Sequence, residues 1–195
     1  MPELYRDASH PVDERVKDLL GRMTLEEKVR QMSQRDIGEL LRDGVVDAAR
    51  VREQLGGGIG TLQDARIDPA RSAAAVNAVQ RYLVDETRLG IPGLVIAECL
   101  HGHMSDGATI FPQSIALASS WNADLVAHVA AAAAKEARAV GVAQALAPDL
   151  DLARDPRWGR VEETYGEDPY LVERMGVAYV RGMQGAGPAI DGEHL

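Results

Sequence analysis

The sequence predicts an α/β fold in which short parallel strands alternate with helices. Short apolar runs alternate along the 195 residues with longer segments of helical periodicity. One run, residues 94–97 (LVIA), is apolar throughout, as strands buried on both faces are. Glycine and proline separate the segments, and this alternation is typical of parallel strands joined by helical crossovers.

Two architectures fit this alternation, a doubly wound sheet and a TIM-type (β/α) barrel. A complete barrel has eight strands and takes roughly 250 residues. The chain offers only three or four strand candidates. If the fold is a barrel, residues 1–195 would therefore supply about its first half.

The N-terminal part of the chain is predicted to be helical. A first helix is expected over residues 11–23. Thr24 and Glu27 then have the spacing of a capping box, in which each side chain accepts a hydrogen bond from the other residue's backbone N–H. This pair predicts the start of a second helix.

The glycine cluster at residues 56–60 leads into a short buried strand at Thr61 and Leu62. Such a cluster could indicate a nucleotide-binding loop. However, Gln63 stands where a dinucleotide fingerprint has its third glycine, and no Gly-Lys-Ser/Thr follows. We therefore interpret the cluster as tight backbone packing.

The remaining elements are predicted from periodicity and end signals. Helices are expected over residues 70–87, 122–140 and 168–183, and strands over residues 94–97 and 142–152. Asn122 and Asp168 are suitable N-caps, Pro169 suits a first helical turn, and Gly141 suits a C-terminal stop.

Composition and charge exclude several classes of protein. The net charge of −9 and the sequence pI near 5.0 argue against nucleic acid and anionic membranes as partners. The single cysteine, Cys99, allows no internal disulfide and no Cys-rich metal site. The first sixteen residues have no apolar core like that of a signal peptide, so we expect a cytoplasmic location. No pattern calls for a metal or an organic cofactor.

Polar residues gather where two of the predicted strands end. They are Glu98, His101 and His103 after the strand at 94–97, and Asp149, Asp151, Arg154, Asp155, Arg157 and Arg160 at or after the next. Parallel α/β folds bind ligands at the carboxyl ends of strands. Carboxylates accept hydrogen bonds from sugar hydroxyls, and a guanidinium donates two parallel ones, so the set suits a polyhydroxylated ligand.

Simpler roles remain open for these residues. Asp149 and Asp151 could cap loops or pair with Arg154 and Arg157. His101 and His103 could bind a metal, but no third-ligand pattern supports one. The serines lack the Gly-x-Ser-x-Gly elbow of a serine hydrolase.

Four stretches together resemble glycoside hydrolase family 3. They are residues 97–102 (AECLHG), 108–113 (ATIFPQ), 146–160 (LAPDLDLARDPRWGR) and 162–170 (EETYGEDPY). The resemblance covers most of residues 12–185. It implies an N-terminal TIM-barrel-like domain and hydrolysis of β-glycosides from the non-reducing end with retention of configuration. The implied partner is a β-linked oligosaccharide or glycoside.

The resemblance also implies roles for particular residues. Glu98 and Arg160 match family positions that bind the sugar at the cleaved residue. Asp155 and Trp158 match positions that we expect to shape the loop. His101 is expected to support the geometry at the strand end rather than to act as a base.

The catalytic residues of the family have no counterpart in this sequence. A retaining glycosidase needs two carboxyl groups roughly 5 Å apart. In the family the nucleophile and the acid/base lie later, after a Lys-His pair, whereas this sequence has only ten residues after Gly185. We therefore expect no catalytic residue here, no activity of the chain alone, and an open sheet edge completed by a further segment or a second chain.

Two questions remain open at this point. The chain could be part of a β-glycosidase or a non-catalytic carbohydrate- or partner-binding remnant of one. Glu98 stands where family members that act on glucosides often carry Asp, and the longer side chain could favour a pentose. Xyloside and glucoside are therefore both retained as substrates.

Overall fold

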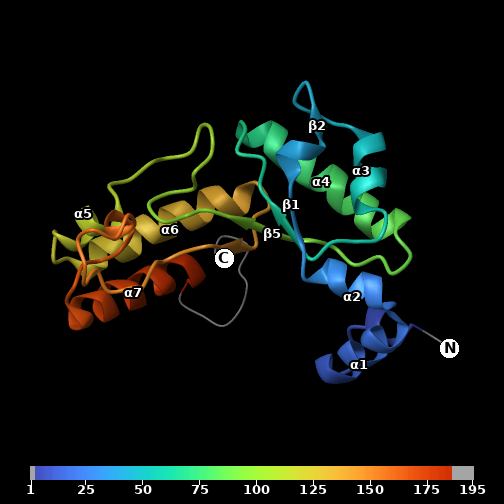
Figure 1. Cartoon of the computed structure of the whole chain (residues 1–195), viewed down its shortest axis with the longest axis horizontal. Helices are drawn as coiled ribbons and strands as arrows, with labels where there is room; N and C mark the ends of the chain where they lie inside the picture. The colour runs from blue at the N-terminus through green and yellow to red at the C-terminus, as the bar shows by residue number, and fades with distance from the viewer. Residues whose placement is uncertain (1–2, 186–195) are drawn as a thin grey trace.

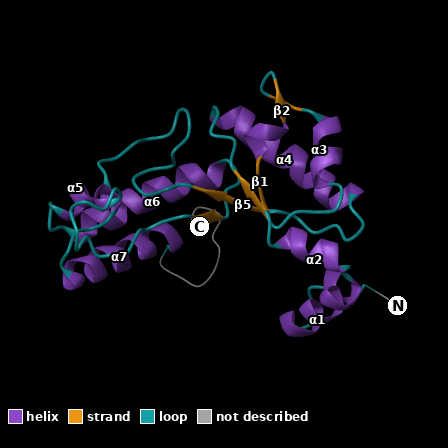
Figure 2. Cartoon of the chain, in the orientation of Figure 1, coloured by secondary structure: helices purple, strands orange, loops and turns teal. Residues whose placement is uncertain are grey.

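The centre of the molecule is a four-stranded parallel sheet with the strand order β1-β4-β5-β6 (Figures 1 and 2). The computed structural model describes residues 3–185. The strands are β1 (Gln34–Asp36), β4 (Thr61–Gln63), β5 (Leu94–Ala97) and β6 (Gln144–Ala145). A separate antiparallel hairpin is formed by β2 (Leu41–Arg42) and β3 (Val45–Val46). The predicted α/β class with parallel strands is confirmed.

Helices connect and flank these strands. The α-helices are α1 (Val12–Arg22), α2 (Leu25–Gln31), α3 (Ala48–Leu55), α4 (Pro69–Glu86), α5 (Ser114–Ala118), α6 (Ala123–Ala139) and α7 (Pro169–Gln184), and the 3-10 helices are η1 (Leu4–Arg6), η2 (Ile37–Leu40) and η3 (Val161–Glu163). All five helices predicted from the sequence are present. Those missed, α3 and α5, are only 8 and 5 residues long. Strand β1 was also missed, because its three residues are all polar and show no apolar pattern.

The strand predicted over residues 142–152 is wrong in its extent. Only Gln144–Ala145 pairs with β5, through Ile96 and Ala97. The Leu146 N–H makes a last hydrogen bond to the Ala97 carbonyl at 2.9 Å, and the residues after it leave the sheet. Pro148, which follows a cis peptide bond, has no N–H to donate. This early departure turns the following loop across the end of β5.

The predicted helix ends are confirmed by their hydrogen bonds. Thr24 Oγ1 accepts from Glu27 N at 3.2 Å, and Glu27 Oε2 accepts from Thr24 N at 2.8 Å, so the capping box is complete. Asn122 caps α6 and Asp168 caps α7 through the backbone N–H three residues on. Gly141 has a φ of 94°, a conformation suited to the residue after a helix.

Helices α6 and α7 pack closely along each other (Figure 1). Small residues allow the approach: a Cβ on Gly182 would lie 2.3 Å from the Ala127 carbonyl oxygen, so a larger side chain there would separate the helices. The buried Tyr179 of α7 donates a hydrogen bond to the carbonyl of Cys99, just after β5. Helix α7 is thereby tied to the end of the central strand.

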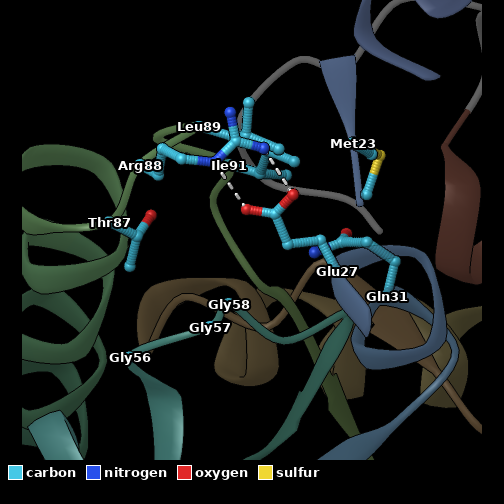
Figure 3. Close-up of a pocket in the computed structure, with 10 residues that line it drawn as sticks. All are labelled: Met23, Glu27, Gln31, Gly56, Gly57, Gly58, Thr87, Arg88, Leu89 and Ile91. Atoms are coloured by element: carbon cyan, nitrogen blue, oxygen red, sulfur yellow. Dashed lines mark hydrogen bonds and ion pairs between the residues drawn. The ribbon is translucent and has the colours of Figure 1, made fainter. Parts of the chain in front are cut away.

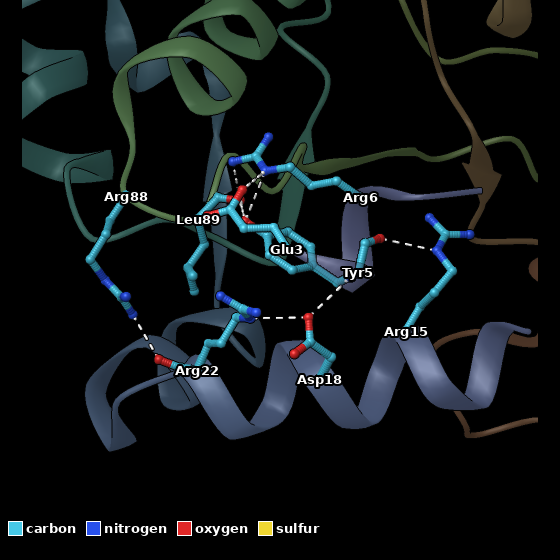
Figure 4. Close-up of polar contacts among 8 residues, drawn as sticks. All are labelled: Glu3, Tyr5, Arg6, Arg15, Asp18, Arg22, Arg88 and Leu89. Carbon is cyan, nitrogen blue, oxygen red and sulfur yellow. Dashed lines mark hydrogen bonds and ion pairs between the residues drawn. The ribbon is translucent and has the colours of Figure 1, made fainter. Parts of the chain in front are cut away.

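The N-terminal segment is fastened to the body by polar contacts (Figure 4). Tyr5 Oη donates to the Leu89 carbonyl at 2.8 Å, after α4. The Tyr5 backbone N–H donates to Asp18 Oδ2 at 3.1 Å, and Arg15 Nε donates to the Tyr5 carbonyl at 3.0 Å. These bonds hold η1 between α1 and the loop after α4, away from the carboxyl ends of the strands. Among residues 3–185, no helix is both long and apolar enough to cross a bilayer.

Candidate functional site

Acidic residues mark the carboxyl ends of all four parallel strands. Asp36 ends β1, Asp64 and Glu98 directly follow β4 and β5, and Asp149 lies a short way past β6. The strands are in register, with Gln63 opposite Ile96 and Ile96 opposite Gln144. Because parallel strands end at a common edge, the four carboxylates lie along one edge of the sheet.

Two of these carboxylates are fully engaged by protein partners. Asp36 accepts from Arg66 Nη2 at 2.9 Å and from the Gly38 backbone N–H at 2.7 Å. Asp64 Oδ2 accepts from His103 Nε2 at 3.0 Å, and the two side chains are 1% and 3% exposed. Gln63 Nε2 donates to the other oxygen of Asp64 at 3.0 Å. This end of the edge holds loops in place.

The other two carboxylates line an open cavity of about 450 Å³, which we call the strand-end hollow. Its walls are Glu98, Leu100, Leu146, Pro148, Asp149, Leu150, Asp151 and Arg160. Within the described residues, the partly buried Glu98 carboxylate has no hydrogen bond or ion pair. The neighbouring Cys99 is fully buried, and burial, together with Asp64 and Glu98, raises the pKa of its thiol to about 12. Cys99 is therefore a packing residue and not a nucleophile.

Asp149 is held by a turn on one side and faces a cation on the other. Its Oδ1 accepts from the Asp151 backbone N–H at 2.9 Å. Its Oδ2 lies 3.7 Å from Arg160 Nη2, within ion-pair range but too far for a hydrogen bond. No described residue donates a hydrogen bond to this buried oxygen.

Arg160 projects into the hollow from the start of η3, and Glu163 orients it. Arg160 Nε lies 3.1 Å from both Glu163 carboxylate oxygens, and Nη2 lies 2.6 Å from Oε2. This two-pronged contact raises the pKa of the Arg160 guanidinium and lowers that of the Glu163 carboxyl. Arg160 keeps further N–H donors, chiefly on Nη1, that Glu163 does not use.

The structure thus brings together the main residues singled out in the sequence. Glu98, Asp149, Asp151 and Arg160 share the hollow. The suggested pairing of Asp149 and Asp151 with Arg154 and Arg157 is wrong, because Arg157 folds back onto Asp155 at 2.7 Å. That local contact within the loop is consistent with a shaping role for Asp155.

His101 fastens the loop that follows β5. Its Nδ1 donates to the Phe111 carbonyl at 2.9 Å, and the Phe111 N–H donates back to the His101 carbonyl at 2.8 Å. The Met104 N–H donates to the Glu98 carbonyl at 3.1 Å, which closes the turn around Glu98. These contacts are consistent with the supporting role expected for His101.

The Asp64–His103 pair was not predicted from the sequence. The sequence singled out His103 after the strand at 94–97, but only as a possible metal ligand, and it gave no signal for Asp64 directly after β4. The partner lies 39 positions further on, on a different loop. No local spacing connects the two residues, so only the fold reveals the pair.

The glycine cluster forms no ligand site (Figure 3). The cavity that Gly56, Gly57 and Gly58 line measures about 20 Å³, about the space of one water molecule. A Cβ on Gly60 would lie 1.8 Å from the Gln31 carbonyl oxygen. The interpretation as tight packing is confirmed.

The cation beside the glycine cluster is also occupied. Arg88 Nε and Nη2 donate to Glu27 at 2.9 and 2.5 Å, as the dashed lines in Figure 3 show. The guanidinium is therefore not available to bind a phosphate in this cavity.

The chain belongs to glycosyl hydrolase family 3: the model of the family's N-terminal domain matches residues 24–194. Residues 186–194 of that match lie outside the described residues. A putative β-xylosidase from Formosa agariphila is 37% identical over 187 residues, which are 93% of this chain and 25% of that protein.

Solved structures agree with this assignment. A β-glucosidase from Erythrobacter marinus matches with a TM-score of 0.81 and 40% identity, over 94% of this chain and 24% of that one. The β-glucosidase from Listeria innocua in complex with glucose matches with a TM-score of 0.77 and 32% identity, over 93% of this chain and 25% of that one. The chain thus spans about a quarter of the length of these relatives.

Proposed function

We propose that this chain is the sugar-binding N-terminal part of a β-glycosidase that hydrolyses terminal, non-reducing β-D-glucosides or β-D-xylosides with retention. The strand-end hollow is the observation that carries this proposal. It combines Glu98, whose carboxylate has no partner among residues 3–185, with the guanidinium of Arg160, which Glu163 orients. The β-glucosidases and the β-xylosidase among the relatives support the same class of substrate.

Glu98 and Arg160 divide the recognition of the sugar between acceptor and donor. The Glu98 carboxylate accepts hydrogen bonds from one or two hydroxyls, and the free N–H groups of Arg160 donate to hydroxyl oxygens. Both are charge-assisted bonds, which are stronger than neutral ones. The paired hydrogen bonds between His101 and Phe111 keep the loop after Glu98 in one arrangement during binding.

This chain supplies neither the nucleophile nor the acid/base in the proposed enzyme. Retention requires two carboxyl groups roughly 5 Å apart. We assign these roles to residues beyond the 195 of this chain, in a further segment or a partner chain. The isolated chain is therefore expected to bind sugar weakly and to hydrolyse nothing.

The test begins with the intact mass of the protein from its native source, followed by assays on 4-nitrophenyl β-D-glucoside and β-D-xyloside. A mass several-fold above 21.0 kDa and hydrolysis of either glycoside would support the proposal. If the longer protein hydrolyses neither, the proposed activity is wrong. A native mass near 21.0 kDa without activity would favour the non-catalytic remnant. Hydrolysis by the isolated chain would refute its assigned role.

A further inference from the structure

Arg160 lies between two carboxylates that hold it unequally. Glu163 makes three contacts to it at 2.6–3.1 Å, whereas Asp149 Oδ2 lies 3.7 Å from its Nη2. The Arg160 side chain is 58% exposed, so the protein does not enclose it by packing. Its direction therefore depends on these two charges, with a weaker contribution from the nearby Asp151.

Asp149 differs from Glu163 in its burial. The Asp149 side chain is only 8% exposed, against 25% for Glu163. Burial of a carboxylate oxygen without a hydrogen bond is unfavourable, and an ion-pair partner offsets part of that cost. Only Arg160 forms an ion pair with Asp149 in the described part of the chain, so the two residues depend on each other.

The backbone fixes where this buried charge stands. Oδ1 of Asp149 accepts from the Asp151 N–H, which locks the side chain against its own turn. The turn follows β6 directly, beside the end of β5 and Glu98. The charge on Asp149 is therefore fixed in place beside the guanidinium that Glu163 holds.

We propose that Asp149 is a positioning residue, whose buried carboxylate draws the Arg160 guanidinium into the strand-end hollow, where it can bind sugar. Glu163 holds the Nε and Nη2 groups of the guanidinium, and Asp149 attracts the same Nη2 from the turn after β6. This inference rests on the proposed function. It assigns Asp149 no contact with the sugar and no part in bond cleavage.

A double-mutant cycle on the native-length protein tests this role. Asp149→Asn keeps the Oδ1 acceptor of the turn and removes the charge, and we expect kcat/KM on the aryl glycosides to fall about tenfold, mainly through KM. In an Arg160→Met background the same change should have little further effect, because Asp149 acts through Arg160. An equal loss in both backgrounds would overturn the proposal, since it would indicate a direct sugar contact or a general structural defect.

The matched control is Glu162→Gln, which removes an exposed charge on η3 next to Glu163. It should leave kcat/KM unchanged. Asp149→Ser, whose hydroxyl can still close the turn, is a second variant should Asp149→Asn fold poorly. Thermal melting identifies any variant that has lost its fold.

A second measurement does not depend on hydrolysis. Phenylglyoxal modifies neutral guanidine groups, and peptide mass spectrometry reports its rate at Arg160. With Asp149→Asn we expect the rate of modification to rise severalfold, because the variant lacks the neighbouring anion that keeps the guanidinium charged and engaged. Glu162→Gln should not change the rate. A faster rate in a protein that hydrolyses no β-glycoside would support the positioning role and refute the proposed function. An unchanged rate would refute the positioning role.

Discussion

The two ends of the carboxyl edge of the sheet use the same residue type for different purposes. At the β1–β4 end, Asp36 and Asp64 are hydrogen-bonded to Arg66 and His103 at 2.9 and 3.0 Å, and a second donor engages the other oxygen of each. At the β5–β6 end, the Glu98 carboxylate has no partner among residues 3–185. Asp149 accepts a hydrogen bond from the Asp151 N–H on Oδ1, but the cation nearest its Oδ2 lies 3.7 Å away. Saturated carboxylates stabilise loops, whereas carboxylates with unused acceptor capacity can bind a ligand.

The largest expected effect comes from removing the positive charge of Arg160 at the β5–β6 end. Arg160→Met should lower kcat/KM on aryl β-glycosides about 10²–10³-fold in the native-length protein, because charge-assisted donors to the sugar are lost. The midpoint of urea unfolding should fall only modestly, because Arg160 is largely exposed and its ion pair with the buried Asp149 spans 3.7 Å. An enzyme that keeps full activity with methionine here would remove Arg160 from the site.

The structural end should respond in stability instead. His103→Ala leaves the Asp64 carboxylate buried with only the Gln63 amide as donor, and should cost about 3 kcal/mol in the free energy of unfolding. Urea unfolding measures this loss, with the exposed His128→Ala as control. Equal midpoints for the two variants would mean that the buried pair contributes little.

Glu163 belongs to both groups of carboxylates. Its own oxygens are hydrogen-bonded to Arg160, and this contact orients Arg160, which keeps free N–H donors for a ligand. Glu163→Gln should lower kcat/KM about tenfold by loosening the guanidinium, which corresponds to about 1.4 kcal/mol. Glu162→Gln, one position earlier on η3, should have no effect. If both variants lose activity equally, the loss reflects overall charge and not the contact with Arg160.

Changing the side-chain length at Glu98 tests whether this residue sets the preference between glucoside and xyloside. Glu98→Asp shortens the carboxylate by one methylene and should make room for a hexose hydroxymethyl group. The ratio of kcat/KM for the glucoside to that for the xyloside should then rise about fivefold, roughly the 1 kcal/mol that a methylene contributes in a pocket. An unchanged ratio would show that Glu98 does not set the preference.

The smallest effect is expected for the ion pair of Glu27 and Arg88, which lies away from the carboxyl edge of the sheet. Arg88 and the Thr24 N–H hold the pKa of Glu27 at about 2, below its usual value of 4.5. A lowered pKa stabilises the fold fully above pH 4.5, and this contribution is lost as the pH falls toward 2. Glu27→Gln should therefore cost about 0.5–1 kcal/mol at pH 7, measured by urea unfolding.

The difference between the wild-type protein and Glu27→Gln should shrink as the pH approaches 3. Glu26→Gln, whose carboxylate is 75% exposed, is the control and should change stability less. A difference between wild type and Glu27→Gln that stays constant with pH would contradict the lowered pKa.

Local signals in the sequence sufficed for the α/β class, the five predicted helices and the N-caps of three of them. Thr24 with Glu27, Asn122 and Asp168 each act within three residues, so spacing alone reveals them. The resemblance of residues 97–102 and 146–160 to a family added Glu98 and Arg160 as sugar-binding candidates, which stay predictions until they are tested. The matching stretches also contain Asp149 and Glu163, but spacing assigns neither of them a role.

Tertiary structure decided what local signals cannot encode. Strand β1 is recognised only because β4 pairs with it, since its own residues are polar. The strand predicted over residues 142–152 stops at Ala145, because β5 offers no backbone partner beyond Ala97 within the parallel pairing. Which carboxylate is matched and which is left open depends on partners up to 39 residues away, a distance at which only the fold sets the contact.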